Sequence, residues 1–468
     1  MLTPLQAEHG SNTVTGLPDD LFSSIDFTHG ALVAISGGGD STALLLLLKR
    51  HLDRKAQAAP LLAVTVDHDL RPNSAAEAKA VAQLCAEHGI PHKTLVWNGA
   101  KPSTGLPAAA REARYRLLAE AAKDAGIGMI VTGHTADDQA ETVSMRQRRA
   151  QAADPRHERG LAGMAPATLY GWSVWIVRPL LGARRETLRE FLRREGVGWI
   201  EDPTNTDEHF ERPRIRAALH EGRAAHRFAD SMAATAGAAT MRETVSRHAA
   251  ILIRDFASQP TPGLVRLDPA FAGGDRHAAV TAMRMLLATV GGTPFPPDEA
   301  RTAALFDRLG TPGLCATLSR TVIDVRRAGI FLRRERRDLP AASIAIGGMV
   351  WDGRRRINFR DEGGGLLIEP LGNAPATERP LPENGVPDSL LRAANAAEPA
   401  FRHDPERTAL SSRKPSDAEV LPLVAPFARF LPSFDLDLAA ALADLVGAPA
   451  LPMPPLTGLR GGRQAGKA

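Results

Sequence analysis

The chain contains little cysteine: only Cys85 and Cys315 occur in 468 residues, and they lie far apart in the sequence. This spacing argues against a disulfide scaffold, a C-x-x-C redox pair and a zinc or iron–sulfur site built from cysteines. Long hydrophobic runs are also missing, so no segment is expected to cross a bilayer. The polar N-terminus, residues 1–16, lacks the apolar core of a signal peptide. We therefore expect a cytoplasmic protein.

Lysine is scarce as well, because it supplies only eight of the 57 basic residues and arginine supplies the rest. The planar guanidinium of arginine suits recognition of phosphates and bases, so a nucleic-acid partner is one explanation. A GC-rich genome, which favours alanine, arginine, glycine and proline codons together, explains the bias equally well. The net charge of +4 is too modest to decide between them.

The chain is longer than one compact core allows, so about two to three domains are expected. Apolar residues make up 44% of it, which is typical of a globular protein and too high for a largely disordered one. The residue patterns predict an α/β domain over 1–222, a helical domain over 223–312, a small mixed or β-rich domain over 313–440 and a flexible tail over 441–468.

The first domain alternates short apolar runs with amphipathic stretches. Strands separated by helices indicate the α/β class, with a doubly wound parallel sheet and right-handed crossovers. Ser74 is expected to cap its helix, with Glu77 three residues on. Strands are predicted at 31–35, 61–67, 92–97, 129–133 and 175–177, and helices at 42–48, 74–88, 107–123, 135–148 and 184–195.

The segment SGGGDS follows the first predicted strand and precedes its helix. Glycines let the backbone approach a phosphate, and the first N–H groups of the helix point at it. A carboxylate beside phosphates requires a metal ion or backbone N–H groups to offset its charge. The segment therefore predicts a phosphate-binding loop, and a plain glycine-rich turn is the simpler alternative. Its members are Ser36, Gly37, Gly38, Gly39, Asp40 and Ser41.

Two common nucleotide motifs do not match this loop. The P-loop of kinases needs a Lys-Ser/Thr pair after its second glycine, and the dinucleotide fingerprint needs G-x-G-x-x-G. The pattern Ser-Gly-Gly-x-Asp-Ser instead resembles the PP-loop of ATP pyrophosphatases, which cleave ATP between the α and β phosphates and adenylate a substrate. Ligands of such sheets lie at the carboxyl ends of the strands. Asp40, Asp67 and His134 all follow strand ends, so we expect them to converge on one crevice.

A second polar cluster, GHTADDQAET, begins the helix after the fourth strand. Thr135 can cap this helix, with Asp138 three residues on. Asp137 and Glu141 are four residues apart and share one helix face. The helix dipole explains part of this acidity. The functional interpretation is a site for a cationic ligand or Mg²⁺, with one carboxylate as general base, and His134 is either part of it or a buried, hydrogen-bonded histidine.

Further candidates lie where the same crevice is expected. Asp67 and His68 end the second strand, where a tight turn is the structural alternative. Arg111 and Arg114 share one side of a helix, where a solvated face is the alternative. The remaining arginine candidates are Arg71, after the second strand, and Arg212 and Arg216, in the polar loop that ends the first domain.

Seven stretches of the chain together resemble the tRNA(Ile)-lysidine synthetase family. They cover about residues 31–219, nearly half the chain, and they run in the family's order at sensible spacing. The C-terminal half carries no motif that we can assign. The stretches are SGGGDS, VDHDLRPNSAAEA, AREARYRLLAEAA, VTGHTADDQAET, GLAGM, RPLLGARRETLREFL and EDPTNTDEHFERPRIR.

The resemblance implies a PP-loop enzyme whose first domain adenylates and whose helical domain binds tRNA. ATP, with Mg²⁺, activates the C2 oxygen of the wobble cytidine of isoleucine tRNA with a CAU anticodon, and pyrophosphate leaves. The ε-amine of free lysine then attacks C2 and expels AMP. The product, lysidine, pairs with A rather than G, so the tRNA reads AUA and is charged with isoleucine rather than methionine.

That chemistry gives each candidate residue an expected role. Asp137 binds and deprotonates the lysine, Glu141 helps to hold it, and Asp138 is structural or metal-bound. We expect catalytic roles for Asp137, Asp40, Arg71 and His134; ATP contacts from Ser36, Gly37, Gly38, Gly39, Asp40, Ser41, Asp67 and His68; substrate contacts from Arg111, Arg114, Asp138, Glu141, Arg212 and Arg216; and metal contacts from Asp40 and Asp138.

Two positions depart from the family pattern. Thr135 stands where a second histidine is usual, and it is a sound N-cap. Pro213 stands where asparagine is usual and lacks both the amide and a backbone N–H, which questions any role of that amide in holding a ligand. The nearest rival function is another PP-loop tRNA-modifying enzyme, such as a tRNA thiolase, and a non-catalytic tRNA- or nucleotide-binding protein is more distant. No membrane partner is expected, and a homodimer is one option for the oligomeric state.

Overall fold

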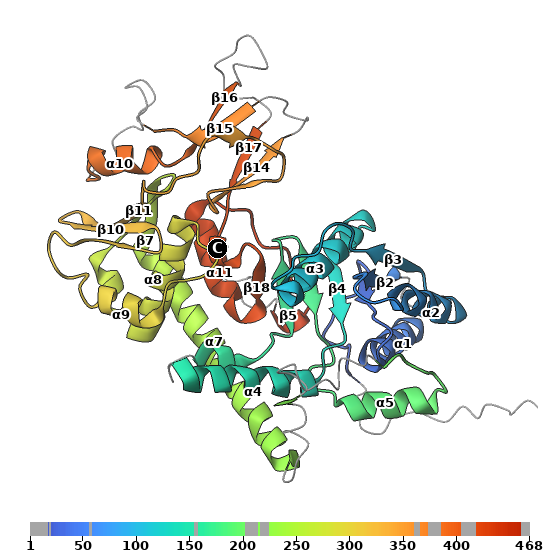
Figure 1. The fold of residues 1–468 in the computed structure, drawn as a ribbon. Coiled ribbons are helices and arrows are strands. Elements are labelled where there is room, and N and C mark those ends of the chain that lie inside the picture. The colour runs from blue at the N-terminus through green and yellow to red at the C-terminus, as the bar shows by residue number, and fades with distance from the viewer. Residues whose placement is uncertain are drawn as a thin grey trace, which may run out of the picture. The chain divides into compact units, whose positions relative to one another are not determined.

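The computed structural model describes residues 17, 20–55, 59–153, 158–201, 214–215, 224–359, 366–372, 385–403 and 418–459. Figure 1 labels the elements that they form. The chain divides into two compact units, one made of Met1–Ala239 with Met453–Ala468 and the other of Thr240–Pro452. Among the helices in the described ranges, none is long and apolar enough to cross a membrane.

A mostly parallel sheet forms the centre of the first unit (Figure 1). Its strands in this unit follow the order β5-β6-β4-β1-β2-β3, so β1 lies between β2 and β4. β5 is antiparallel to β6, and the other neighbours are parallel, which confirms the predicted α/β class. The strands are β1 (Ala31–Ala34), β2 (Leu61–Asp67), β3 (His92–Val96), β4 (Met129–Thr132), β5 (Ala167–Tyr170) and β6 (Val174–Val177).

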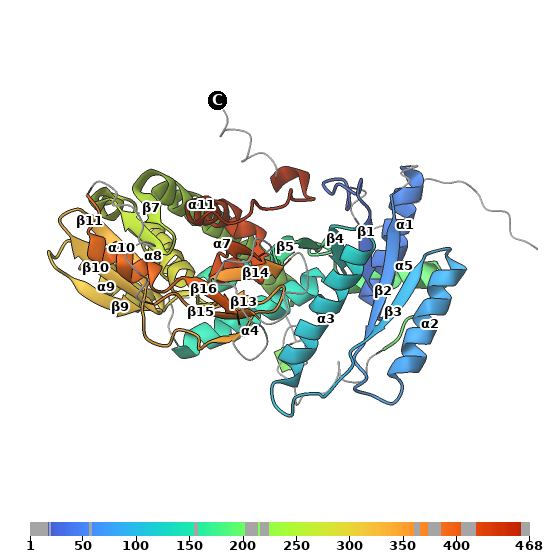
Figure 2. The same cartoon turned by 90° about the horizontal axis from the view of Figure 1, so that it is seen from above.

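Helices cover both faces of this sheet: α1, α2 and α5 lie on one side and α3 on the other (Figure 2). Because both faces are covered, the inner strands β1 and β4 are buried along their whole length, as the apolar runs in the sequence predict. The helices are α1 (Gly39–Arg54), α2 (Ser74–Glu87), α3 (Leu106–Asp124), α4 (Ala136–Ala153) and α5 (Arg185–Arg194), with short 3-10 turns η1 (Glu158–Ala162) and η7 (Thr457–Leu459).

The first unit differs from the predicted elements in two places. The strand predicted at 175–177 is β6, and it pairs with the antiparallel strand β5, which is too short for its periodicity to show in the sequence. Helix α2 begins at Ser74 itself, with Asn73 in the N-cap position and no side-chain cap. The N–H of Ser74 donates to the carbonyl of Arg71 at 3.2 Å, so the turn after β2 supplies the helix start.

The described part of the second unit combines helices with three antiparallel sheets, of orders β7-β8-β11-β10-β9, β12-β15-β16 and β13-β14-β17. Helix α8 is buried on nearly all sides and forms its helical centre. Strands β7 and β8 fall within the segment predicted to be helical. Helix α11 extends into the segment predicted as a tail, where its leucines and alanines are buried. The domain boundaries near 222, 312 and 440 stay predictions. The elements are α7 (Ala224–Phe256, which contributes to both units), β7 (Ala257–Thr261), β8 (Leu264–Leu267), η3 (Pro269–Gly273), α8 (Arg276–Gly291), α9 (Glu299–Phe306), β9 (Cys315–Leu318), β10 (Thr321–Arg326), β11 (Gly329–Arg334), β12 (Ser343–Ile344), β13 (Val350–Trp351), β14 (Arg355–Phe359), β15 (Leu366–Pro370), α10 (Asp388–Asn395), β16 (Pro399–His403), β17 (Ala418–Pro422), η5 (Ala425–Phe427), β18 (Phe430–Pro432), η6 (Ser433–Asp435) and α11 (Leu436–Val446).

Candidate active site

The segment between β1 and α1 forms a compact loop braced by its serines. The Oγ of Ser41 donates to the carbonyl of Gly38 at 3.0 Å and accepts from the N–H of Ser36 at 3.2 Å. Gly37 has a φ of +81°, a left-handed conformation that favours glycine. Gly38 occupies the N-cap position of α1 without a side-chain cap, so the first N–H groups of this helix can bind an anion.

Two residues after α5 cover this loop. The N–H of Ile200 donates to the carbonyl of Gly37 at 2.9 Å. The Ile200 side chain lies so close that a Cβ on Gly37 would come within 2.6 Å of its Cδ1. Trp199 lies over Gly39, 3.5 Å from the position of a Cβ there. The covering segment therefore leaves no room for a side chain at Gly37.

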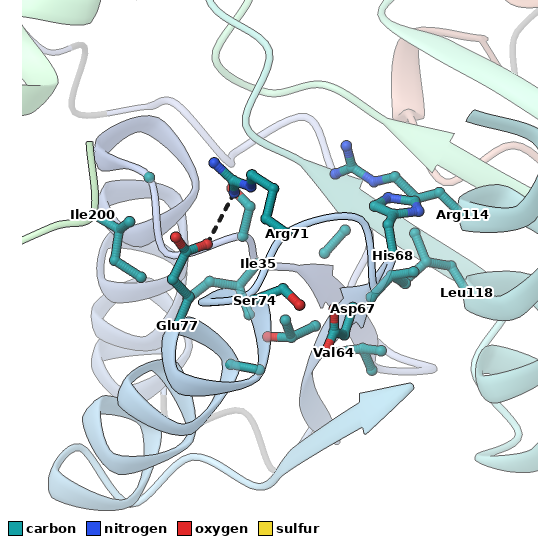
Figure 3. A pocket seen from close by; sticks show the side chains of 16 residues that line it. Ile35, Val64, Asp67, His68, Arg71, Ser74, Glu77, Arg114, Leu118 and Ile200 are labelled. Atoms are coloured by element: carbon teal, nitrogen blue, oxygen red, sulfur yellow. Dashed lines mark hydrogen bonds and ion pairs between the residues drawn. The ribbon is translucent and has the colours of Figure 1, made fainter. Parts of the chain in front are cut away.

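A cavity of about 360 Å³ opens at the carboxyl ends of β1 and β2 (Figure 3). Its volume lies in the range of small-ligand sites. The loop contributes Ser36 and Gly38 to the lining, and α3 contributes Arg114. The cavity is polar where the loop borders it, as the binding of a nucleotide phosphate requires. The other polar residues that line it are Asp67, His68, Arg71, Ser74 and Glu77.

His68 lines the cavity and has a ring nitrogen without a hydrogen bond among the described residues. Its Nδ1 is buried, and no described residue hydrogen-bonds to it. Its ring meets that of Trp97 edge to face, with 5.9 Å between the centroids. Burial lowers the pKa of His68 below its ordinary value of 6.5, and the nearby Arg114 guanidinium lowers it further. The imidazole is therefore neutral near physiological pH.

Asp67 and Arg71 are oriented by local contacts. The Oδ1 of Asp67 accepts from the N–H of Asp69 at 2.8 Å, so the strand-end carboxylate also shapes the turn after β2. The Nη2 of Arg71 donates to the Oε2 of Glu77 on α2, 3.0 Å away. Figure 3 marks this contact. The end of β2, the turn after it and the start of α2 thus hold two carboxylates and one guanidinium at the cavity.

The start of α4 is a capping box, as predicted. The N–H of Thr135 donates to Oδ2 of Asp138 at 2.9 Å, and the N–H of Asp138 donates to Oγ1 of Thr135 at 3.3 Å. The other oxygen of Asp138, Oδ1, accepts from Nη2 of Arg185 at 2.9 Å. Asp138 therefore has a structural role at the helix start and an ion pair at the same time.

Arg185, the first residue of α5, lies at the centre of an acidic cluster of three carboxylates. Its Nε donates to Oδ2 of Asp40 at 2.9 Å, and its Nη1 to Oε1 of Glu141 at 3.4 Å. Burial alone would lower the pKa of Arg185, but the carboxylates of Asp138, Asp40 and Glu141 together raise it. The guanidinium therefore stays charged and offsets one of the three negative charges.

The two carboxylate oxygens of Asp40 have different surroundings, and Oδ2 is the one that bonds to Arg185. Its Oδ1 is buried, and no described residue hydrogen-bonds to it. Burial raises the pKa of Asp40 above its ordinary value, and the Arg185 guanidinium acts in the opposite direction. A cation or a phosphate-bound metal at Oδ1 would satisfy this oxygen.

Asp137 is also hydrogen-bonded to the start of α5. It accepts from the backbone N–H of Arg185 at 2.7 Å and from Nε of Arg184 at 3.2 Å. The Arg184 guanidinium also lies 3.9 Å from the ring centroid of Phe228. Asp137 and the cluster around Arg185 are thus adjacent, with a net excess of negative charge.

The structure has two neighbouring sites where the sequence predicts a single crevice: the cavity and the acidic cluster around Arg185. Asp67 lines the cavity, whereas Asp40 and His134 are not among its lining residues. The reason is the loop itself: Ser36 faces the cavity, and Asp40, in the first turn of α1, reaches Arg185. His134 Nδ1 lies 2.9 Å from the Oγ1 of Thr132, so it is held at the end of β4.

The other predicted arginines fall in different settings. Arg111 is exposed and lies over the ring of Tyr115, 5.0 Å from its centroid, outside the cavity lining. Arg114, one turn on, lines the cavity. Arg212 and Arg216 lie outside the described residues, as does Pro213.

Asp40 and Asp138 were predicted to hold a metal ion. The described residues contain no group of three or more histidine, cysteine or acidic side chains arranged to hold one. Mg²⁺, however, usually takes only one or two carboxylates and completes its shell with water and substrate phosphates. The unbonded Oδ1 of Asp40 beside the anion-binding loop fits that mode, while Asp138 is already bonded to Arg185 and to Thr135.

Sequence reasoning missed Arg184 and Arg185 as site residues. One signal was present: two arginines at the start of α5 oppose the helix dipole, which favours acidic residues there. Such a placement indicates carboxylate partners from elsewhere in the fold. Ile200 was missed too, because nothing in the sequence indicates that it covers Gly37.

The loop, the cavity and the sheet define a PP-loop enzyme that uses ATP, and residues 19–222 match the family model described as a PP-loop domain. A tRNA(Ile)-lysidine synthase of Mesorhizobium japonicum is 59% identical over 96% of this chain and 99% of its own length. Those of Rhizobium meliloti and Brucella ovis are 36% and 40% identical over 91% and 73% of this chain, and over 93% and 76% of their own. The chain belongs to the tRNA(Ile)-lysidine synthase family, a family of tRNA-modifying ligases.

A solved structure, that of the U34-tRNA thiolase NcsA from Methanococcus maripaludis with its [4Fe-4S] cluster, aligns over 47% of this chain and 77% of its own. The identity is 14% and the TM-score 0.39, so the alignment carries no functional argument.

Proposed function

We propose that this enzyme ligates lysine to C2 of the wobble cytidine of isoleucine tRNA with a CAU anticodon, through a C2-adenylate. One observation carries the proposal: the loop at 36–41 borders the cavity on one side and contributes Asp40 to the acidic cluster on the other. An anionic nucleotide and a cationic amino acid can therefore meet at one loop. The lysine, the adenylate and the tRNA follow from the family to which the chain belongs.

In the first step the cavity binds ATP, and Asp67, His68, Arg71 and Arg114 line its walls. Loss of pyrophosphate builds negative charge at the loop. The backbone N–H groups of the α1 start are fixed in advance to receive that charge. Asp40 is the residue that would hold Mg²⁺, which neutralises phosphate charge when bound. The C2 oxygen of the cytidine bonds to the α-phosphorus of ATP as the bond from that phosphorus to pyrophosphate breaks, so this oxygen can later leave as part of AMP.

In the second step a lysine side chain must bind as a cation and then lose a proton before it attacks C2. Asp137 is the proposed base, since it lies beside the cluster and stays accessible enough to exchange partners, with 15% of its side chain exposed. Glu141, buried on the same helix face, extends the negative surface. Arg111, Arg212 and Arg216 stay candidates for tRNA or the lysine carboxylate.

The product would change decoding from AUG to AUA and charging from methionine to isoleucine. The second unit is the proposed reader of tRNA parts away from the anticodon. A homodimer and a cytoplasmic location stay predictions.

The cysteines weigh against the rival function, a tRNA thiolase. Burial raises the pKa of Cys85 to about 11, so its thiol is a poor nucleophile and sulfur carrier. Cys315, the other cysteine, is exposed on β9 and does not line the cavity. The buried Cys85 is therefore unsuited to carry sulfur to a nucleotide activated in the cavity.

Transfer of labelled lysine to an unmodified CAU-anticodon isoleucine tRNA transcript, with ATP and Mg²⁺, tests the proposal. A transcript with uridine at the wobble position is the matched control. We expect label on the first transcript and none on the second. Pyrophosphate release that depends on tRNA, without lysine incorporation, would keep the adenylating step and refute the lysine substrate.

A further inference from the structure

The acidic cluster joins two parts of the chain that are distant in sequence. Asp40 comes from the first turn of α1, whereas Asp138 and Glu141 come from the first turns of α4. All three carboxylates bond to the guanidinium of Arg185. The side chain of Arg185 is only 16% exposed and that of Glu141 only 2%, so little water screens these contacts.

Without a cation between them, these carboxylates would repel one another. Like charges at close range disfavour ionisation and push their elements apart. Arg185 carries a planar fork whose three nitrogens reach three different partners, which a lysine ammonium cannot reproduce. The same residue's backbone N–H also binds Asp137, the proposed base.

We propose that Arg185 is a positioning residue that fixes the PP-loop carboxylate against the amino-acid-binding face of α4. The inference rests on the proposed function. Arg185 is absent from the lining of the ATP cavity, so it acts on the geometry between the two half-sites rather than on nucleotide binding. It sets the distance between the activated cytidine at the loop and the amine held by α4.

The consequence is a loss in rate rather than in affinity when Arg185 is removed. A displacement of about 1 Å between reacting groups can cost about 100-fold in rate. Removal of the guanidinium leaves more negative charge for the lysine ammonium, so its affinity should not fall. A lower rate with unchanged affinities distinguishes a positioning role from general damage to the fold. General damage would weaken the binding of both ATP and lysine.

The test compares Arg185→Gln and Arg185→Lys with the wild type in steady-state lysine transfer to the CAU-anticodon transcript, with ATP affinity measured separately. Arg116→Gln is the matched control, because Arg116 is half exposed on α3 and pairs there with Glu120, 3.1 Å away. We expect Arg185→Gln to lower kcat about 100-fold, with the KM for lysine unchanged or lower and ATP affinity within about threefold. Arg185→Lys should recover part of kcat, and Arg116→Gln should match the wild type.

A kcat of Arg185→Gln equal to that of the wild type would overturn the inference. A lower ATP affinity together with a higher KM for lysine and a lower melting temperature, without recovery in Arg185→Lys, would also overturn it, because these changes would show a structural role alone. Absence of lysine transfer by the wild type would refute the proposed function and this inference with it, so the two failures are distinguishable.

Discussion

The Nε of Arg185 donates to Oδ2 of Asp40 at 2.9 Å, across 145 positions of sequence. This bond links the start of α5 to the phosphate-binding loop. It holds one carboxylate oxygen and leaves the other, Oδ1, buried and unbonded by any described residue. One turn of helix therefore contains both the first N–H groups of α1 and a buried carboxylate oxygen that no described residue binds.

Asp137→Asn should block lysine transfer and spare ATP binding. An asparagine oxygen can still accept from the N–H of Arg185, so the start of α5 is retained, but the amide cannot take a proton from lysine. We expect lysine transfer to fall at least about 100-fold, with ATP affinity unchanged. Asp124→Asn, at an exposed helix end, is the control. Near-normal transfer by Asp137→Asn would show that another group is the base.

Gly37→Ala should weaken both stability and ATP binding. The alanine would adopt a left-handed φ, which costs about 1–2 kcal/mol, and would also displace Ile200 from its place over the loop. Gly126→Ala is a matched control, since its φ is +67° but nothing described lies within 4 Å of its Cβ position. ATP titration of both variants should show a loss only for Gly37→Ala. Equal ATP affinity in the two variants would contradict the close approach of Ile200.

Most elements of the first unit, though not β5, could be predicted from the sequence because their signals are local. The strand–glycine–helix order at 31–48 and the capping box between Thr135 and Asp138 both depend on residues a few positions apart. The contacts of Arg185 could not be predicted, since its partners lie 44 to 145 residues away and any of 53 acidic residues could have met it. The separation of Asp40 from the cavity was missed for the same reason: it depends on which side of the loop each side chain faces.

His68→Gln should reduce the acid sensitivity of the fold. Burial and Arg114 lower the pKa of His68 in the folded state below the value of 6.5 expected when unfolded. The unfolded chain therefore binds the proton more readily, and the folded state loses stability as the pH falls from 6.5 through the lowered pKa. Glutamine does not titrate. Free energies of unfolding measured between about pH 8 and pH 5 should fall less steeply for the variant, and parallel curves would contradict the burial of His68.

Asp352→Asn should destabilise the second unit strongly. Asp352 is fully buried and binds Arg334, also fully buried, through two hydrogen bonds of 3.0 and 3.1 Å, and Arg354 at 2.8 Å. Removal of its charge leaves the buried guanidinium of Arg334 without a carboxylate partner, which costs about 3–5 kcal/mol, whereas Arg354 keeps Glu398 at 2.7 Å. Urea unfolding measures this loss.

Asp307→Asn provides the comparison for that experiment. Asp307 pairs with Arg276 at 2.9 Å, but both side chains are more than half exposed, so its loss should cost about 0–1 kcal/mol. Similar costs for the two substitutions would show that the contacts around Asp352 do not stabilise the unit.

The most direct test of the two-step account is a chase experiment with ATP labelled at the α-phosphate. The enzyme is first mixed with the CAU-anticodon transcript, Mg²⁺ and labelled ATP in the absence of lysine, and lysine is then added. The account predicts label bound to tRNA before the chase and its release as AMP, with formation of lysidine, after it. AMP release without tRNA-bound label, or tRNA-bound label that lysine does not discharge, would contradict an adenylate formed at the PP-loop and consumed at the acidic cluster.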